Sequence, residues 1–376
     1  MVLKLITIQR MQLSDIIIEK IRHKGPIPFR DFMEMCLYDP DAGYYTSRED
    51  KIGANGDYYT SSDLSELSGA MIGKQLEEMW AITGRKEFSI VEYGAGTGRL
   101  CNDVLDYLKN NREFYSVLKY YIIEKSPSMR QKEEGLLTGK VTWLESIREL
   151  CPVTGCIISN ELVDNFSVHK VVMEDELKEV FVDYHNGFVE LLKPADKKLV
   201  DYFGELGVGL PAGFCTEINL EATEWIKEIA TCLEKGYVLT IDYGYLSGEL
   251  YKQCRSKGTL LCYHQHTIND EPYHNIGKQD ITSHVNFSAL SHWGSKYGLH
   301  TSGYINQAGF FLSLDWEDHL NKVLLKKRDT YLGFREYAFL KYIFLVDMGQ
   351  KFNVLIQQKG VPSTSLRGLQ KKFSTN

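Results

Sequence analysis

A glycine-rich turn that follows an apolar run is the feature that most constrains the fold of this chain. The run from Phe88 to Tyr93 favours a β-strand, the turn spans residues 94–98, and a helical pattern follows from Leu100 to Lys109. Because glycine has no Cβ, such a turn can adopt positive φ angles and let a ligand approach the backbone. The start of the following helix adds N–H groups that have no partner within the helix. We therefore expect a strand–turn–helix unit that binds a ligand.

The spacing of the turn glycines distinguishes two kinds of cofactor loop. Gly94, Gly96 and Gly98 follow the order Gly-x-Gly-x-Gly. A dinucleotide-binding loop would have its third glycine at position 99, where this chain has Arg99. The observed spacing is instead typical of class I methyltransferases, whose loop holds S-adenosyl-L-methionine, and we expect that cofactor here. The alternative is a tight turn that needs positive φ and binds nothing.

Polar side chains stand at the ends of three expected strands, where a cofactor would lie. Glu92 comes just before the glycines and could hold the cofactor's ammonium group. Glu124 ends the run 120–124, where an acidic side chain can accept hydrogen bonds from ribose hydroxyls. Asn160 ends the run 156–160. We assign all three to the cofactor site, with a surface carboxylate as the alternative for Glu124.

Strand and helix patterns alternate along most of the chain, which predicts a parallel sheet with helices. The alternation covers residues 65–165 and resumes over residues 234–358. Residues 166–233 interrupt it with three alternating runs, separated by turn signals, that predict an antiparallel insertion followed by a helix. We interpret residues 1–64 as a helical cap or lid and residues 359–376 as a flexible tail. The predicted fold class is α/β, a Rossmann-like class I methyltransferase sheet with an N-terminal helical cap and an antiparallel β insertion.

Composition argues against several classes of partner and compartment. The 376-residue chain has a formal net charge of −7, which provides no overall positive field for nucleic acid. No run approaches the roughly 18 apolar residues that cross a bilayer, so we expect no membrane span. In the absence of a signal-peptide or transit-peptide pattern, we expect a cytoplasmic location. The eight cysteines show no Cys-x-x-Cys spacing and predict free thiols in a reducing compartment.

Histidines occur in the long polar segment between residues 245 and 285. The pair His264 and His266 suggests a metal site, but no set of nearby acidic or cysteine ligands completes one. We therefore expect no metal.

Motifs far beyond the glycine turn match one known group. They are Leu37-Tyr38-Asp39-Pro40, Gly43-Tyr44-Tyr45, Gly56-Asp57-Tyr58-Tyr59-Thr60-Ser61, Glu124-Lys125-Ser126-Pro127, Asn160-Glu161-Leu162-Val163-Asp164, Ile241-Asp242-Tyr243-Gly244 and Asp280-Ile281-Thr282-Ser283-His284. With the glycine loop, they cover the chain from about residue 13 to about residue 358. The chain resembles the MidA-like methyltransferases, whose mitochondrial members assist the assembly of respiratory complex I. It departs from the family's Asp-Ala-Leu-Pro-like segment at Asn165-Phe166-Ser167, on the expected substrate face.

The resemblance implies in-line transfer of a methyl group to an arginine side chain of a partner protein. A respiratory-complex subunit is the implied kind of protein substrate, and we also expect a homodimer. Two alternatives stay open: a non-catalytic assembly factor with the same fold, and a small-molecule methyltransferase.

Acidic side chains after the fourth strand are the expected catalytic groups. A guanidinium has a pKa above about 12, so flanking carboxylates should orient it and collect the released proton. Glu161 and Asp164 are placed for this role, with the start of a helix as the alternative. His266 is assigned to the same site because it matches a family motif, and a hydrogen-bonding scaffold is its alternative. Tyr58 and Thr60 are assigned to the cofactor, with aromatic packing as the alternative for the tyrosine.

Overall fold

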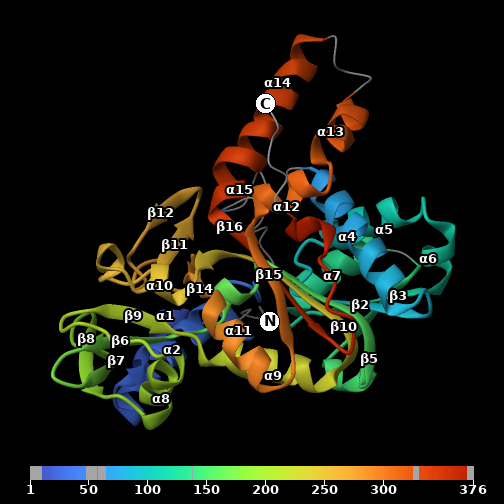
Figure 1. Cartoon of the computed structure of the whole chain (residues 1–376). Coiled ribbons are helices and arrows are strands. Elements are labelled where there is room, and N and C mark those ends of the chain that lie inside the picture. The colour runs from blue at the N-terminus through green and yellow to red at the C-terminus, as the bar shows by residue number, and fades with distance from the viewer. Residues whose placement is uncertain (1–10, 48–56, 58–64, 138, 325–329, 371–376) are drawn as a thin grey trace, which may run out of the picture.

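The structure is a computed structural model and describes residues 11–47, 57, 65–137, 139–324 and 330–370. A central mixed sheet is covered by helices, and a smaller antiparallel sheet lies beside it with the first two helices (Figure 1). This architecture confirms the predicted α/β fold. The helices are α1 (Leu13–Lys24), α2 (Phe29–Tyr38), α4 (Leu67–Thr83), α5 (Arg99–Leu108), α6 (Arg112–Val117), α7 (Pro127–Leu136), α8 (Lys197–Leu206), α9 (Leu220–Cys232), α10 (Ser247–Leu250), α11 (Phe287–Lys296), α12 (Gln307–Ser313), α13 (Trp316–Leu324), α14 (Tyr331–Tyr342) and α15 (Met348–Lys351).

The central sheet combines parallel strands with an antiparallel edge. Its strands are β2 (Phe88–Tyr93), β3 (Leu118–Ile123), β4 (Val141–Leu144), β5 (Val153–Asn160), β10 (Leu233–Tyr245), β14 (Val285–Asn286), β15 (His300–Asn306) and β16 (Phe352–Lys359). The order is β15-β16-β10-β5-β2-β3-β4, and β14 pairs with β10. The strands from β10 to β4 are parallel, whereas β16 is antiparallel to both β10 and β15. The carboxyl ends of β2, β3 and β5 therefore meet at one edge, where open α/β sheets bind their ligands.

Side chains along the central strands alternate between two apolar layers, as the pleat requires. Ile90 packs in the layer that contains α4 and α5, and its neighbour Val91 packs in the layer that contains α9 and α11. Ile158 and Ile157 divide between the same two layers. Because helices cover both faces, apolar residues stand next to one another in these strands, as in Ile90-Val91 and Cys156-Ile157-Ile158.

The insertion and the cap form one packed unit. The five strands of its sheet are β1 (Ile27–Pro28), β6 (His169–Met173), β7 (Leu177–Tyr184), β8 (Phe188–Pro194) and β9 (Cys215–Ile218). Ile27 of β1 pairs with Val182 of β7, so the segment between the first two helices completes the insertion's sheet. Phe29 and Phe32 of α2 are buried in the same cluster as Val180. A third, three-stranded sheet is made of β11 (Leu261–His264), β12 (Thr267–Asn269) and β13 (Asp280–Thr282).

The C-terminal part of the chain contains two projecting helices and a packed end. Helices α13 and α14 project from the body of the molecule (Figure 1). The expected flexible tail is packed on the core as far as residue 370. Leu366 is fully buried, and the N–H of Gly368 donates to Oε1 of Gln75 at 3.0 Å. A single buried leucine in a polar segment leaves no periodic signal, which is why the sequence did not predict this packing.

Cys151 and Cys232 form a disulfide with a Cα–Cα distance of 4.9 Å, so the expectation of eight free thiols is wrong. The two cysteines are 81 residues apart in the chain. They meet because Leu233 of β10 pairs with Val153 of β5, which brings the preceding segments side by side. Neither the spacing nor the composition could reveal that pairing.

Within the described ranges, no helix is long and apolar enough to cross a bilayer. We retain as a proposal the division of the chain into a cap (1–64), a core (65–165 and 234–358), an insertion (166–233) and a tail (359–376).

Candidate active site

A cavity of about 450 Å³ lies where β2, β3 and β5 end. Its lining residues lie at the ends of those strands and in the segments that follow them, directly after β4, in the cap and on α9. They are Tyr38, Tyr45, Glu92, Tyr93, Gly94, Ala95, Gly96, Thr97, Leu100, Ile123, Glu124, Lys125, Met129, Glu145, Asn160, Glu161, Leu162, Asn165, Phe166, Glu221 and Trp225. The volume is in the range of small-molecule sites.

The glycine turn forms one wall of the cavity. Gly94, Gly96 and Gly98 have φ angles of 64°, 59° and 77°, in the left-handed region that favours glycine. A Cβ on Gly94 would lie 2.7 Å from Cδ1 of Leu162. Gly98 directly precedes α5, so the turn and the start of a helix face the same space. This backbone is shaped for close contact with a ligand.

Glu92 lines the cavity beside the turn and is almost fully buried. The Tyr120 hydroxyl donates to Oε2 of Glu92 at 2.6 Å. Burial raises the pKa of Glu92 to about 7, although the hydrogen bond from Tyr120 acts in the opposite direction. A cationic ligand would favour the ionised form of this carboxyl.

Glu124 follows β3 and has a carboxyl neighbour that the sequence analysis missed. The N–H of Ser126 donates to Oε1 of Glu124 at 2.7 Å. Burial raises the pKa of Glu124, and burial together with the charge of Glu124 raises the pKa of Glu133 to about 9. Trp143 donates from Nε1 to Oε2 of Glu133 at 2.7 Å. The available signal was a carboxyl at a core-facing position of α7, four residues after the buried Met129.

Asn160 and Glu161 lie together at the end of β5. Glu161 has a φ of 52°, and Nδ2 of Asn160 is 3.3 Å from Oε1 of Glu161. Asp242, at the end of the neighbouring strand β10, is fully buried and holds the segment that follows Glu161. Its Oδ2 accepts the N–H groups of Leu162, Val163 and Asp164 at 3.2, 2.9 and 3.3 Å. Asp242 therefore positions the loop that carries Glu161.

Asp164 is buried behind the cavity and is not one of its lining residues. Burial raises its pKa to about 7, and the nearby Tyr243 hydroxyl acts against that rise. Asp280 lies nearby, where burial and the charge of Asp164 raise its pKa to about 8. The hydroxyl of Tyr45, which lines the cavity, donates to Oδ2 of Asp280 at 2.8 Å. The Tyr45 side chain therefore connects the cavity to the carboxyls of Asp280 and Asp164.

Two other predicted site residues, Gly98 and His266, are not among the described residues that line the cavity. His266 is exposed at the β11–β12 turn, and its N–H donates to the carbonyl of Asp57 at 3.2 Å. Tyr58 and Thr60 lie outside the described residues. In the described part of the chain, no group of three His, Cys, Asp or Glu side chains could hold a metal ion.

The remaining lining residues give the cavity its charge and its aromatic surface. Within the described ranges, Lys125 is the one basic residue of the lining, and Nζ of Lys125 lies 3.9 Å from the centre of the Tyr38 ring. Tyr38, Phe166 and Trp225 supply aromatic faces. Five carboxyl groups stand against that single lysine: Glu92, Glu124, Glu145, Glu161 and Glu221. The cavity suits ligands that carry positive charge.

Comparisons with known proteins agree over nearly the whole chain. The model of a family described as "Putative S-adenosyl-L-methionine-dependent methyltransferase" matches residues 71–305, more than half of the chain. The Drosophila melanogaster "Protein arginine methyltransferase NDUFAF7 homolog, mitochondrial" is 26% identical, covering 92% of this chain and 85% of its own length. The Homo sapiens protein of that name is 25% identical, covering 89% and 80%. A Burkholderia thailandensis protein crystallised with S-adenosyl-homocysteine is 27% identical with a TM-score of 0.86, covering 95% of this chain and 94% of its own.

These relatives correct the predicted location. We expected a cytoplasmic protein, whereas the relatives from Drosophila melanogaster and Homo sapiens are named as mitochondrial. Composition and the lack of a recognised N-terminal pattern do not determine the compartment in which a fold works.

Proposed function

We infer that this chain, which belongs to the family of S-adenosyl-L-methionine-dependent methyltransferases, transfers a methyl group to an arginine side chain of a partner protein. The observation that carries the inference is the cavity with five carboxyl groups, one lysine and a glycine wall. S-adenosyl-L-methionine supplies an electrophilic methyl group on a cationic sulfonium. An acceptor guanidinium is also cationic, so both partners of the reaction match the charge of the cavity.

The residues around the cavity fit that cofactor. Leu162 leaves room at position 94 only for a residue without Cβ, which keeps this backbone open to a ligand. We propose that Gly94, Gly96 and Gly98 contact the cofactor through their backbone. The carboxyls of Glu92, which is buried, and of Glu124, which is half-buried, can accept hydrogen bonds from ammonium and hydroxyl groups. We retain Asn160, Tyr58 and Thr60 as proposed cofactor contacts.

The acceptor would be positioned by Glu161 and deprotonated through Asp164. A carboxylate orients a guanidinium by paired hydrogen bonds, which places one nitrogen in line with the methyl group. Since the pKa of Asp164 is raised to about 7, its carboxylate can take up the proton that methylation releases near neutral pH. We propose that this proton passes from the cavity to Asp164 through the hydroxyl of Tyr45 and the carboxyl of Asp280. His266 stays a prediction; it is exposed and is not among the described residues that line the cavity.

We further propose a mitochondrial location and a respiratory-complex subunit as the substrate. The names of the relatives support the location and the arginine acceptor, and the resemblance to the MidA-like group supports the substrate. A homodimer also stays a prediction, which light scattering of the purified chain tests directly.

The decisive experiment is methyl transfer from labelled S-adenosyl-L-methionine. The full chain is incubated with cofactor and a mitochondrial extract, and labelled peptides are mapped by mass spectrometry. We expect label on arginine, lost in the Gly96→Val variant because Gly96 has positive φ at the cavity wall. The control is Gly209→Val, at an exposed position with open space around its Cβ. Binding without label on any protein would instead favour the non-catalytic factor.

A further inference from the structure

Glu221 presents an unsatisfied oxygen at the cavity. It lies in the first turn of α9 and lines the cavity beside Trp225. Its Oε2 is screened from solvent and makes no hydrogen bond within the described residues. The nearest cationic group recorded for it is the Arg30 guanidinium, with Nη2 3.6 Å from Oε2, which is an ion pair beyond hydrogen-bond length. A buried carboxylate oxygen without a donor is costly, so this position favours a ligand that donates.

Asn165 supplies a second unsatisfied acceptor in the same cavity. The residue is 8% exposed, and its Oδ1 has no hydrogen-bond partner within the described residues. Its Nδ2 lies 3.3 Å from the carbonyl of Glu161, which leaves Oδ1 as the available atom. The Tyr38 hydroxyl contacts the Asn165 carbonyl at 3.3 Å. Asn165 therefore belongs to the segment that departs from the family pattern and also to the wall beside Glu161.

Aromatic rings flank these two acceptors. Phe166 and Trp225 meet edge to face with ring centres 6.0 Å apart, and both line the cavity. Tyr38 lines it as well. A guanidinium is flat, donates five N–H groups and stacks on aromatic faces. Two oxygen acceptors with aromatic walls match that group better than they match an ammonium.

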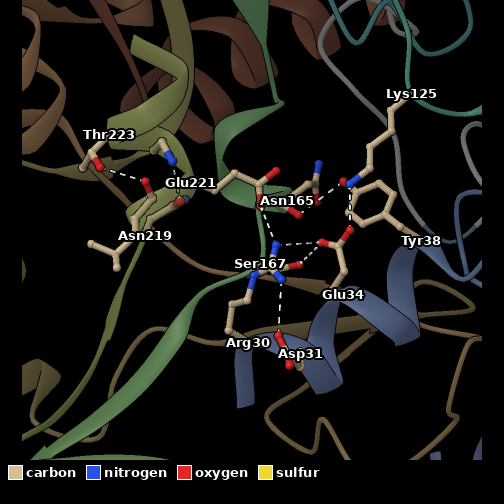
Figure 2. Close-up of polar contacts among 12 residues, drawn as sticks. Arg30, Asp31, Glu34, Tyr38, Lys125, Asn165, Ser167, Asn219, Glu221 and Thr223 are labelled. Atoms are coloured by element: carbon tan, nitrogen blue, oxygen red, sulfur yellow. Dashed lines mark hydrogen bonds and ion pairs between the residues drawn. The ribbon is translucent and has the colours of Figure 1, made fainter. Parts of the chain in front are cut away.

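Arg30 already places a guanidinium next to this site. Figure 2 shows it between α2 and Glu221, with dashed contacts to Asp31 and Glu34. Its Nη1 is 3.3 Å from Oδ1 of Asp31, and its Nη2 is 3.6 Å from Oε2 of Glu34. Glu34 is itself held by Lys125 at 2.9 Å and by Ser167 at 2.8 Å. Arg30 therefore has carboxylate partners on α2 that remain if its weak pairing with Glu221 is broken.

We propose that Glu221 and Asn165 bind the guanidinium of the acceptor arginine, and that Arg30 pairs with Glu221 only until the acceptor replaces it. The proposal rests on the proposed arginine methylation. Glu221 and Asn165 would bind the acceptor together with Glu161. Arg30 would compete with the acceptor arginine for the carboxylate of Glu221. The proposal also gives the Asn165-Phe166-Ser167 segment a role in substrate choice, because its first two residues line the site and its third holds Glu34.

Calorimetric titration tests the proposal with an end-blocked Gly-Arg-Gly peptide and its Gly-Lys-Gly counterpart. The full chain is first saturated with S-adenosyl-homocysteine. Glu221→Gln should weaken binding of the arginine peptide about tenfold, the effect of losing one charged hydrogen-bonding pair. Arg30→Gln should strengthen it about threefold by removing the competitor. The wild-type protein should prefer the arginine peptide.

Matched controls come from α9 itself and from α1, the helix before α2. Glu224→Gln is three residues further along α9, where the side chain is 71% exposed, and Arg22→Gln changes an exposed residue of α1. Both should bind the arginine peptide as the wild type does. Affinity for S-adenosyl-homocysteine shows that each variant is folded, and Glu221→Asp replaces Glu221→Gln if that variant does not fold.

Two results would overturn the proposal: unchanged peptide affinity in Glu221→Gln, or weaker affinity in Arg30→Gln. Different results would contradict the proposed function, arginine methylation. If the peptide binds as expected and arginine is never labelled in the transfer assay, the guanidinium site stands and arginine methylation does not. If arginine is labelled and Glu221→Gln binds normally, the proposed guanidinium site is wrong and the proposed arginine methylation stands.

Discussion

The buried carboxylate of Asp242 accepts the backbone N–H of Val163 at 2.9 Å, across 79 residues of the chain. Two neighbouring N–H groups, of Leu162 and Asp164, point to the same oxygen. The conformation of the loop between Glu161 and Asp164 thus depends on a side chain from another strand.

Removing that acceptor should damage both stability and activity. In Asp242→Ala, three N–H groups lose their partner, and we expect unfolding to require about 2–4 kcal/mol less free energy. Asp242→Asn keeps an oxygen at the same place and should lose much less. Urea unfolding followed by circular dichroism gives both values, and equal losses in the two variants would contradict the role assigned to Asp242.

Adding a Cβ to the first glycine of the turn should weaken cofactor binding. Gly94→Ala introduces strain at a φ of 64° and a contact 2.7 Å from Cδ1 of Leu162. We expect about tenfold weaker binding of S-adenosyl-homocysteine, because the added methyl group and its contact with Leu162 displace the backbone that faces the cavity. The double variant Gly94→Ala, Leu162→Ala should recover part of the loss. Calorimetry measures all three proteins, and an unaffected Gly94→Ala would show that the turn does not touch the cofactor.

Buried carboxyls should make the protein less stable as pH rises. The pKa of Glu133 is raised from 4.5 to about 9, chiefly by burial, so the native state holds a proton that the unfolded chain releases. The resulting stabilisation is complete below about pH 4.5 and is lost as pH rises toward 9. The slope is at most about 1.4 kcal/mol per pH unit for each such proton.

Glu133→Gln removes that titration while keeping a neutral side chain of the same shape. Urea midpoints measured at pH 5, 7 and 9 should therefore fall less steeply with pH in the variant than in the wild type. Glu134→Gln, on the exposed side of the same helix, is the control. Parallel curves for Glu133→Gln and the wild type would mean that Glu133 is ionised in the native state.

Asp164→Asn should separate binding from turnover. The side chain is outside the cavity lining, so affinity for S-adenosyl-homocysteine should be unchanged. Turnover should fall by about 10²–10⁴ because the proposed proton acceptor is lost. The transfer assay with labelled cofactor measures turnover, and normal turnover would remove Asp164 from the proposed catalytic residues.

Local patterns were sufficient to predict the elements that carry the proposed cofactor site. The strand before the glycines, the turn and the helix after it each follow from short-range preferences, and the strand over Phe88–Tyr93 was predicted with its observed bounds. Glu92, Glu124, Asn160 and Glu161 were found because the ends of parallel strands share one edge of a sheet. Their roles remain proposals.

Contacts between distant segments were beyond these patterns. Glu221 reaches the cavity because α9 starts beside the end of β5, and Arg30 reaches Glu221 because β1 joins the sheet of the insertion. The disulfide between Cys151 and Cys232 depends on the register of β5 and β10.

The sequence by itself therefore determined the fold class, the glycine turn and the acidic residues at the strand ends, because each is encoded within a few neighbouring residues. Only the tertiary structure decided which carboxyls are buried, that Asp164 lies behind the cavity, and that Arg30 faces Glu221. Burial and pairing depend on residues brought together by the packing of whole elements, and no local pattern records them.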